Sequence, residues 1–303
     1  FIGIYDSVAI DYSVIELVQN FADGKIRQMG VYDLTAFVTG TVGSLQTSAT
    51  ALEVAHKPLN VIYAGDISGT ADLSTLADLT TLNAKNVSVT IGEDGANTGA
   101  ALAVSESTSI TNLGAALGAV ALAKVNESTE WIEKFNFTDG NEFNVPAFAN
   151  GDLVKTKADS FLSALKDKGY MFMRKPVGLA GTYEQNGATS ISATSDYAKI
   201  ESNRTIDKAT RGVRAFMLPN IAAPVFVSAD GSLTEATIAK FKNDGARALE
   251  QMERDEEISA FKVVIDPTQD VLSTSKLVIT ILIIPVGVAR QIEINIGFTV
   301  SVA

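Results

Sequence analysis

The end of the chain carries the sequence feature that most restricts its fold. Between residues 291 and 302, apolar side chains alternate with polar or small ones, which is the period of a β-strand with one buried face. The residues that define this strand are Gln291, Ile292, Glu293, Ile294, Asn295, Ile296, Phe298 and Val300. Because backbone pairing does not need a covalently close partner, a terminal strand can complete the edge of a neighbouring subunit's sheet. It can equally close a hairpin within its own subunit, and the pattern alone leaves both arrangements open.

The segments before this strand predict a mixed α and β domain. Helical spacing runs from about residue 196 to 217 and from 233 to 254. The second helix has Ser232 as an N-cap and Glu235 three residues later, which is the pattern of a capping box. Apolar runs at 258–265 and 277–284 predict two further strands. We therefore expect a C-terminal domain, residues 186–303, with two long helices and a β-rich tail that can pair between subunits.

The first half of the chain alternates strand and helix signals. The predicted strands are 59–64, 86–91, 131–137 and 170–174, and the predicted helices are 71–82, 110–124 and 159–168. Alternation of this kind favours an α/β lobe with a partly parallel sheet. A stretch rich in Gly, Ser and Thr, residues 178–195, then predicts a boundary. The fold class expected for the whole chain is α/β to α+β, with an N-terminal α/β lobe at residues 1–185.

Composition excludes several classes of partner. The net charge of −11 argues against direct nucleic-acid binding, because phosphate contacts need clustered Lys and Arg. There is no cysteine, hence no disulfide and no thiolate metal site. The longest apolar run, residues 277–289, is shorter than the roughly 20 residues that span a bilayer, so we expect no membrane insertion. Since the first residue is Phe1 rather than Met, we expect a start that is missing or cleaved.

Catalytic motifs are not evident in the sequence. His56 is the single histidine, which leaves no two-histidine metal site within one chain, and we expect it in a surface loop. No spacing selects a catalytic pair from the acidic residues predicted in loops, which are Asp66, Glu142, Asp152 and Asp266. The glycines do not form a dinucleotide or phosphate-binding loop. We therefore predict no catalytic residue, no cofactor and no metal site, and a protein that is not an enzyme.

One basic stripe stands out against the acidic background. Arg204, Lys208 and Arg211 fall at positions i, i+4 and i+7 of the predicted helix 196–217, and Lys240 lies on the next helix. A solvated face, paired in part with Glu201 and Asp207, would explain the stripe. An electrostatic contact with an acidic partner surface would explain it equally well.

The order of features in the second half resembles the C-terminal domain of contractile tail sheath proteins, which occur in phages, R-type bacteriocins and contractile injection systems. The resemblance rests on segments of helix, loop and strand that follow one another in the family's order. These are residues 201–207 opening a helix, 225–227 and 229–231 before the helix 233–254, 261–266, 277–285 and 291–298. It covers about 110 residues well, with weaker support at 171–176 and 181–183.

The resemblance implies a structural subunit that polymerises as stacked hexameric rings around an inner tube and contracts to drive that tube through a target envelope. It also implies baseplate and terminator proteins as partners, and a place in a virion tail or in a contractile particle assembled in the cytoplasm. In that scheme the strand 291–302 is donated to a neighbour, and 277–284 stays in its own subunit. Arg204, Lys208, Arg211 and Lys240 would face the tube, and the N-terminal lobe would lie outward. Two other hypotheses stay open: a non-contractile phage tail or capsid-associated subunit, and an enzyme or carbohydrate-binding domain of α/β type.

Overall fold

The computed structural model describes residues 12–138, 140 and 142–290. Its centre is a parallel four-stranded sheet with the order β1-β2-β3-β6. The strands are β1 (Gln28–Ala36), β2 (Asn60–Asp66), β3 (Val87–Thr90) and β6 (Tyr170–Met171). The register places Val61 opposite both Met29 and Val87, and Val89 opposite Tyr170. The predicted partly parallel sheet is thus confirmed.

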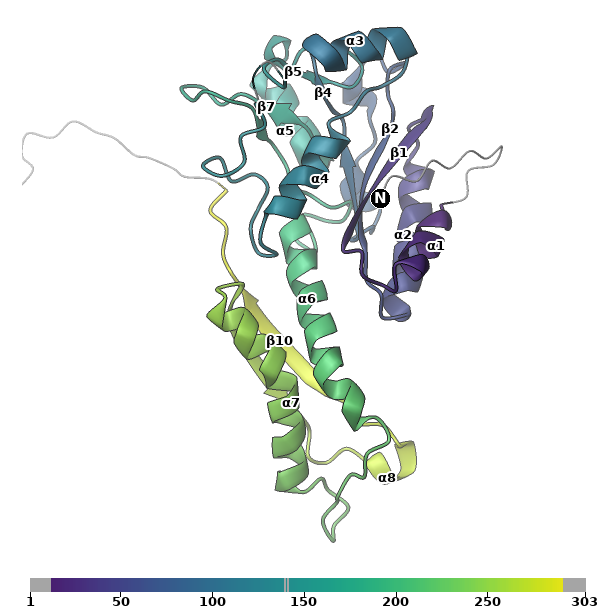
Figure 1. Ribbon diagram of the computed structural model, residues 1–303, viewed down its shortest axis with the longest axis vertical. Coiled ribbons are helices and arrows are strands. Elements are labelled where there is room, and N and C mark those ends of the chain that lie inside the picture. The colour runs from purple at the N-terminus through teal and green to yellow at the C-terminus, as the bar shows by residue number, and fades with distance from the viewer. Residues whose placement is uncertain (1–11, 139, 141, 291–303) are drawn as a thin grey trace, which may run out of the picture.

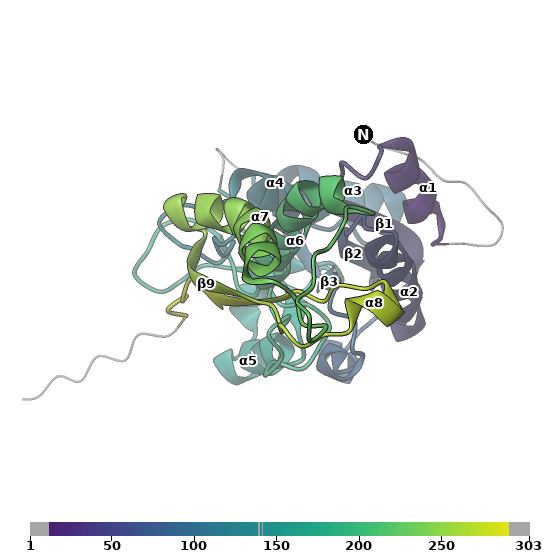
Figure 2. The ribbon, with the colours of Figure 1, turned by 90° about the horizontal axis from the view of Figure 1, so that it is seen from below.

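Helices cover both faces of this sheet, because β2 buries side chains on each side. Val61 and Tyr63 pack in a core with α2 (Thr39–Val54) and α5 (Asp159–Asp167). Ile62 and Ala64 point the other way, into a core with α4 (Leu113–Leu122) and Ile200. Figure 2 shows α4 and α5 on opposite sides of the sheet. Burial on both faces is what a continuous apolar run such as 61–64 requires.

Smaller elements complete the region built around the central sheet, which is called the first body below. Helix α1 (Val14–Phe21) packs beside α2. Two antiparallel pairs, β4 with β5 and β7 with β8, extend the region beyond the central sheet. The bounds are β4 (Gly92–Asp94), α3 (Asn97–Glu106), β5 (Pro146–Phe148), β7 (Met173–Arg174) and β8 (Tyr183–Glu184), with single 3-10 turns at η1 (Leu73–Thr75), η2 (Leu79–Thr81) and η3 (Val154–Thr156).

Helix α6 (Ile200–Met217) joins the first body to a second one, as Figure 1 shows. It begins with Ile200 in the first core and ends beside α7 (Glu235–Arg254). The second body contains η4 (Leu218–Asn220), β9 (Ile258–Val264), α8 (Val271–Thr274) and β10 (Thr280–Pro285). Strands β9 and β10 are antiparallel, and α7 packs on one face of this pair. The α/β to α+β fold class with two long C-terminal helices is confirmed.

The division at residues 185 and 186 stays a prediction. Chain on its C-terminal side still contacts the first body, since Ser190 bridges to Ala84 and the Asn186 amide donates to the carbonyl oxygens of Lys166 and Tyr170. The connection between the two bodies therefore runs along α6.

Three details expected from the sequence are wrong. Residues 71–82 form two single turns instead of a helix, because Asp72 and Asp78 each accept a hydrogen bond from the backbone N–H two residues on. Residues 131–137 form turns instead of a strand. The N-cap of α7 is Thr234, whose Oγ1 accepts from the N–H of Thr237, and Ser232 instead bonds Asp230.

The other predicted elements appear close to their expected bounds. The strand predicted at 277–284 is present as β10, which pairs with β9 of the same chain, and its place relative to neighbouring subunits stays a prediction. The predicted strand at 291–302 lies outside the described residues. His56 lies exposed in the loop between α2 and β2, as expected.

Candidate assembly surface

The sheet of β9 and β10 is open at both edges within the described part of the chain. One face is closed by α7, where Phe261, Val263, Ile281 and Ile283 pack around the buried Leu249. A two-stranded sheet is marginally stable alone, so this packing is what holds it. Each open edge presents unpaired backbone N–H and C=O groups, which are the groups that pair with an added strand.

The opposite face of the same sheet is uncovered and mostly apolar, with the exposed Lys262 opposite Leu282 in the register. Leu282 is 55% exposed and Ile284 is 60% exposed on β10, and Val264 is 37% exposed on β9. They alternate with the side chains that pack on α7, as the period of a strand requires. A mostly apolar face flanked by open edges is a surface suited to protein contact.

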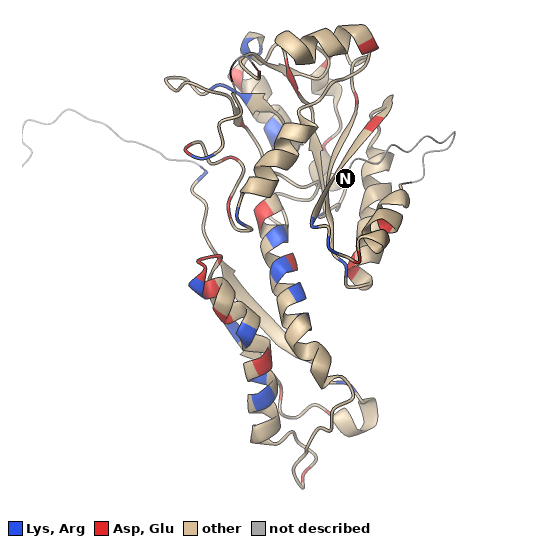
Figure 3. Ribbon diagram, viewed as in Figure 1, with Lys and Arg blue, Asp and Glu red and all other residues tan. Residues whose placement is uncertain are grey.

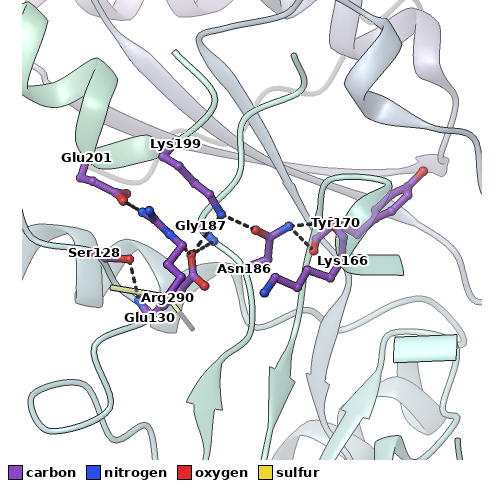
Figure 4. Close-up of polar contacts among 9 residues, drawn as sticks. All are labelled: Ser128, Glu130, Lys166, Tyr170, Asn186, Gly187, Lys199, Glu201 and Arg290. Atoms are coloured by element: carbon purple, nitrogen blue, oxygen red, sulfur yellow. Dashed lines mark hydrogen bonds and ion pairs between the residues drawn. The ribbon is translucent and has the colours of Figure 1, made fainter. Parts of the chain in front are cut away.

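The chain that leaves this sheet returns to the first body at Arg290, the last described residue (Figure 4). Its guanidinium forms an ion pair with Glu201, at the start of α6, and a second one of 3.4 Å with Glu130. Glu201 and Glu130 are both largely buried, so Arg290 neutralises charge that has left water. The base of the predicted C-terminal strand is thus tied to the first body by charge.

Further polar groups surround this ion pair (Figure 4). Glu130 Oε1 also accepts from the N–H of Gly187 at 3.1 Å and from Lys199 Nζ at 3.2 Å. Lys199 Nζ donates in addition to the Asn186 side chain at 2.8 Å. Burial lowers the pKa of Lys199 and raises that of Glu201, and the partner charges partly oppose both shifts. Glu184 nearby is buried, and this burial, followed by the charge of Glu130, raises its pKa well above its ordinary value.

The four cations of the predicted basic surface have different surroundings in the folded chain. Arg204 donates to the carbonyl oxygens of Ala123 and Lys124 at 3.0 and 3.1 Å. Lys208 pairs with Glu257 at 2.5 Å. Arg211 lines a cavity, and Lys240 is exposed on α7 with its Nζ 5.5 Å from the ring centre of Phe241. Figure 3 shows the charged residues along α6 and α7. Their contact with an inner tube stays a prediction.

The loop acids named from the sequence are held by local partners. Asp66 accepts from the N–H groups of Ser68 and Ser109, Asp152 pairs with Lys157, and Asp266 accepts from Thr268. Glu142 accepts from Thr98 and lies beside Asp94, whose pKa is raised by burial and by that contact. Across the described ranges, no three His, Asp or Glu residues gather in a way that could hold a metal ion.

Sequence reasoning missed the cluster at the base of the tail. Arg290 and Glu130 are 160 positions apart, so no local pattern connects them. The one feature of the sequence that could have pointed to this cluster is Arg290 itself, which comes directly before the alternating strand. Within the described part of the chain, no helix has the length and hydropathy needed to cross a membrane.

The comparisons with known proteins give one family model and several solved structures. Residues 196–303 match the family model described as DUF2586, C-terminal domain. The helical sheath of the anti-feeding prophage (AFP) in its contracted state aligns with a TM-score of 0.61 at 12% identity, over 98% of this chain and 76% of that one. A comparison with curated protein sequences gives no match.

Two further solved structures have the same fold. The contracted sheath complex of an extracellular contractile injection system, PVC, aligns with a TM-score of 0.54 at 14% identity, over 85% of this chain and 68% of that one. A chain of the six-fold symmetrised AFP baseplate aligns with a TM-score of 0.53 at 13% identity, over 85% of this chain and 65% of that one. This chain therefore spans about two thirds to three quarters of their lengths. The protein has the fold of contractile injection system sheath proteins, and its C-terminal third matches the C-terminal domain of DUF2586.

Proposed function

We propose that this protein is a structural subunit of a contractile sheath, which polymerises helically around an inner tube and contracts to drive the tube through a target envelope. The observation that carries the proposal is the open sheet of β9 and β10, with its uncovered apolar face. The alternating strand predicted at 291–302, which follows β10 in the sequence, is the segment that could pair with such an open edge. In this proposal the strand adds to the open edge of a neighbour's sheet, and backbone hydrogen bonds link the two subunits.

Linkage by an exchanged strand suits a lattice that has to change shape. A strand held by a ladder of backbone hydrogen bonds stays attached while the bodies it connects rotate and slide into a tighter packing. Such contraction uses the free energy of the new contacts and needs no nucleotide or catalytic residue. A role as an enzyme is therefore not part of the proposal.

The partners proposed beyond the chain itself are an inner tube protein and the proteins that cap the sheath, at a baseplate and at a terminator. Lys240 is the most exposed of the four proposed tube-facing cations, and Lys208 keeps part of its side chain in solvent. Such cations would steer and orient an acidic tube surface more than they would add affinity. The first body would then lie outward, in a virion tail or in a particle assembled in the cytoplasm.

A non-contractile tail or capsid-associated subunit is the second candidate. It would use the same strand exchange, but the aligned sheath structures are contracted sheaths, which favours the first.

The test is negative-stain microscopy of the full chain beside a variant that ends at Arg290. We expect rings or hollow rods from the full chain and folded, unassembled protein from the shortened one, with circular dichroism as the check on folding. A full chain that stays monomeric at high concentration would contradict the proposal.

A further inference from the structure

A small cavity lies between α6 and the edge of the first body, away from the open sheet. It has a volume of about 40 Å³. Because a water molecule needs about 10 to 15 Å³ in the same measure, the cavity has room for a group the size of a carboxylate or a phosphate. Its walls include Lys85, Tyr197, Asp207, Arg211 and Arg214.

Arg211 is the feature of this cavity that needs explanation. Its Nη1 is buried and makes no hydrogen bond within the described part of the chain. A buried guanidinium N–H without an acceptor costs free energy, so native structures normally supply one. Burial, and next the positive charge of Arg27, lowers the pKa of Arg211 to about 10, and Asp207 only partly opposes this. Asp207 thus acts on Arg211 through its charge, while Nη1 still has no acceptor within the described residues.

The two acidic side chains of the cavity are already engaged. Glu53 forms an ion pair of 2.8 Å with Lys85. Asp207 accepts a hydrogen bond of 2.7 Å from Asn60, and burial raises the pKa of this carboxyl to about 6. Arg214 adds a second guanidinium one turn beyond Arg211. Two arginines thus line the cavity, and a single guanidinium group can donate two parallel hydrogen bonds to a planar or tetrahedral oxyanion.

We propose that the cavity lined by Arg211 and Arg214 is a binding site for one oxyanion of carboxylate or phosphate size. Two sources would supply this chemistry, a free inorganic anion or an acidic side chain from a second copy of the chain. The site itself does not depend on the proposed sheath function, because it is complete within one chain.

Thermal unfolding of the unassembled full chain in inorganic phosphate tests the site, with sodium chloride adjusted to constant ionic strength. We expect a saturable rise in the unfolding temperature, of about 2 °C at ten times the dissociation constant. Arg211→Gln should weaken phosphate binding at least about tenfold, since it removes a charged two-pronged donor. The phosphate affinity of Arg211→Lys should lie between those of the wild type and Arg211→Gln, because lysine keeps the charge but cannot donate two parallel hydrogen bonds. Arg254→Gln, which removes an exposed guanidinium from the end of α7, is the matched control.

The order of stabilities separates a binding role from a packing role. Without phosphate, Arg211→Gln should differ little in stability from the wild type, because it removes the cost of burying a guanidinium together with the attraction of that group to Asp207. With phosphate, the wild type should become the more stable of the two. An absent phosphate effect in the wild type, or an equal effect in Arg211→Gln, overturns the proposal.

Repeating the titration on assembled particles identifies the source. If phosphate no longer raises the unfolding temperature once the chain has assembled, a carboxylate of a neighbouring copy occupies the site. If phosphate still raises it, the ligand is a free anion. Failure of the chain to assemble would contradict the proposed function and leave the phosphate titration as the test of the site.

Discussion

The Nε of Arg290 lies 3.4 Å from Oε1 of Glu130, which joins the last described residue to a loop of the first body 160 positions earlier. The same guanidinium reaches Glu201 at the start of α6. The end of the described chain is therefore held against the first body by charge.

Replacing Arg290 with Gln should destabilise the chain. Glu201 would then stay buried without its strongest partner. We expect the free energy of unfolding to fall by about 2 kcal/mol. This is less than the loss expected for a fully buried ion pair, because Arg290 is partly exposed. Urea unfolding measures it. The double variant with Glu201→Gln should recover part of the loss, and additive effects of the two changes would contradict the pairing.

The glycines of two helices should respond to alanine in opposite directions. A Cβ on Gly212 of α6 would lie 2.8 Å from the Cβ of Ala248 on α7, so the two helices would have to move apart. Gly43 of α2 has no atom within 4 Å of the added Cβ. Gly43→Ala should therefore stabilise by about 0.5 to 1 kcal/mol, through helix propensity. Gly212→Ala should destabilise by about 1 to 3 kcal/mol despite the same propensity gain, and a stabilising result would contradict the close approach of α6 and α7.

Stability should fall as pH rises from about 4.5 to 7 because of Glu93. Burial, and next the charge of Asp94, raises the pKa of Glu93 to about 7, against an ordinary 4.5. The folded chain then holds more protons than the unfolded chain within this window, so its stability is greatest at the acidic end and declines toward pH 7. Asp207, with a pKa of about 6, adds a decline of the same sign.

Glu93→Gln should reduce the loss of unfolding free energy between pH 4.5 and 7 by about 1 to 2 kcal/mol. This is less than the value that the whole pKa shift of Glu93 would give. Urea unfolding at a series of pH values measures the difference between the two chains. Parallel pH profiles of the variant and the wild type would show that Glu93 does not titrate in this window.

A charge on the uncovered face of the sheet should block assembly without unfolding the chain. Leu282→Glu places a carboxylate where the side chain is 55% exposed, so the monomer should change stability by less than about 1 kcal/mol. Burial of that charge between subunits would cost several kcal/mol. Sedimentation velocity compares its assembly with that of Val104→Glu, a control at a residue of α3 that is 80% exposed. If both variants assemble equally well, the contact between subunits does not involve the uncovered face of the β9 and β10 sheet.

The sequence predicts those elements whose burial follows a simple pattern. Strand β2 reads as one apolar run because both its faces are covered, and α5 shows regular helical spacing. Strand β1 was missed because it lies at the edge of the sheet and is mostly half-buried or exposed. Helix α2 was missed because Thr, Gly, Ser and Ala fill most of its positions and leave little contrast between its faces.

The candidate sites depend on contacts that are distant in sequence. The basic stripe is visible at a helical spacing, but the sequence does not tell that Arg204 donates to carbonyl oxygens of residues 123 and 124, or that Arg211 lines a cavity. The cluster around Arg290 brings together loops, the start of α6 and the end of the described chain. Only the folded arrangement reveals such a group.

The most direct test of assembly by strand exchange is a cryo-electron microscopy reconstruction of particles formed by the full chain, with residues 291–302 traced. We expect this strand at an open edge of the β9 and β10 sheet of a neighbouring subunit. Pairing of the same residues with β10 of their own subunit would contradict strand exchange.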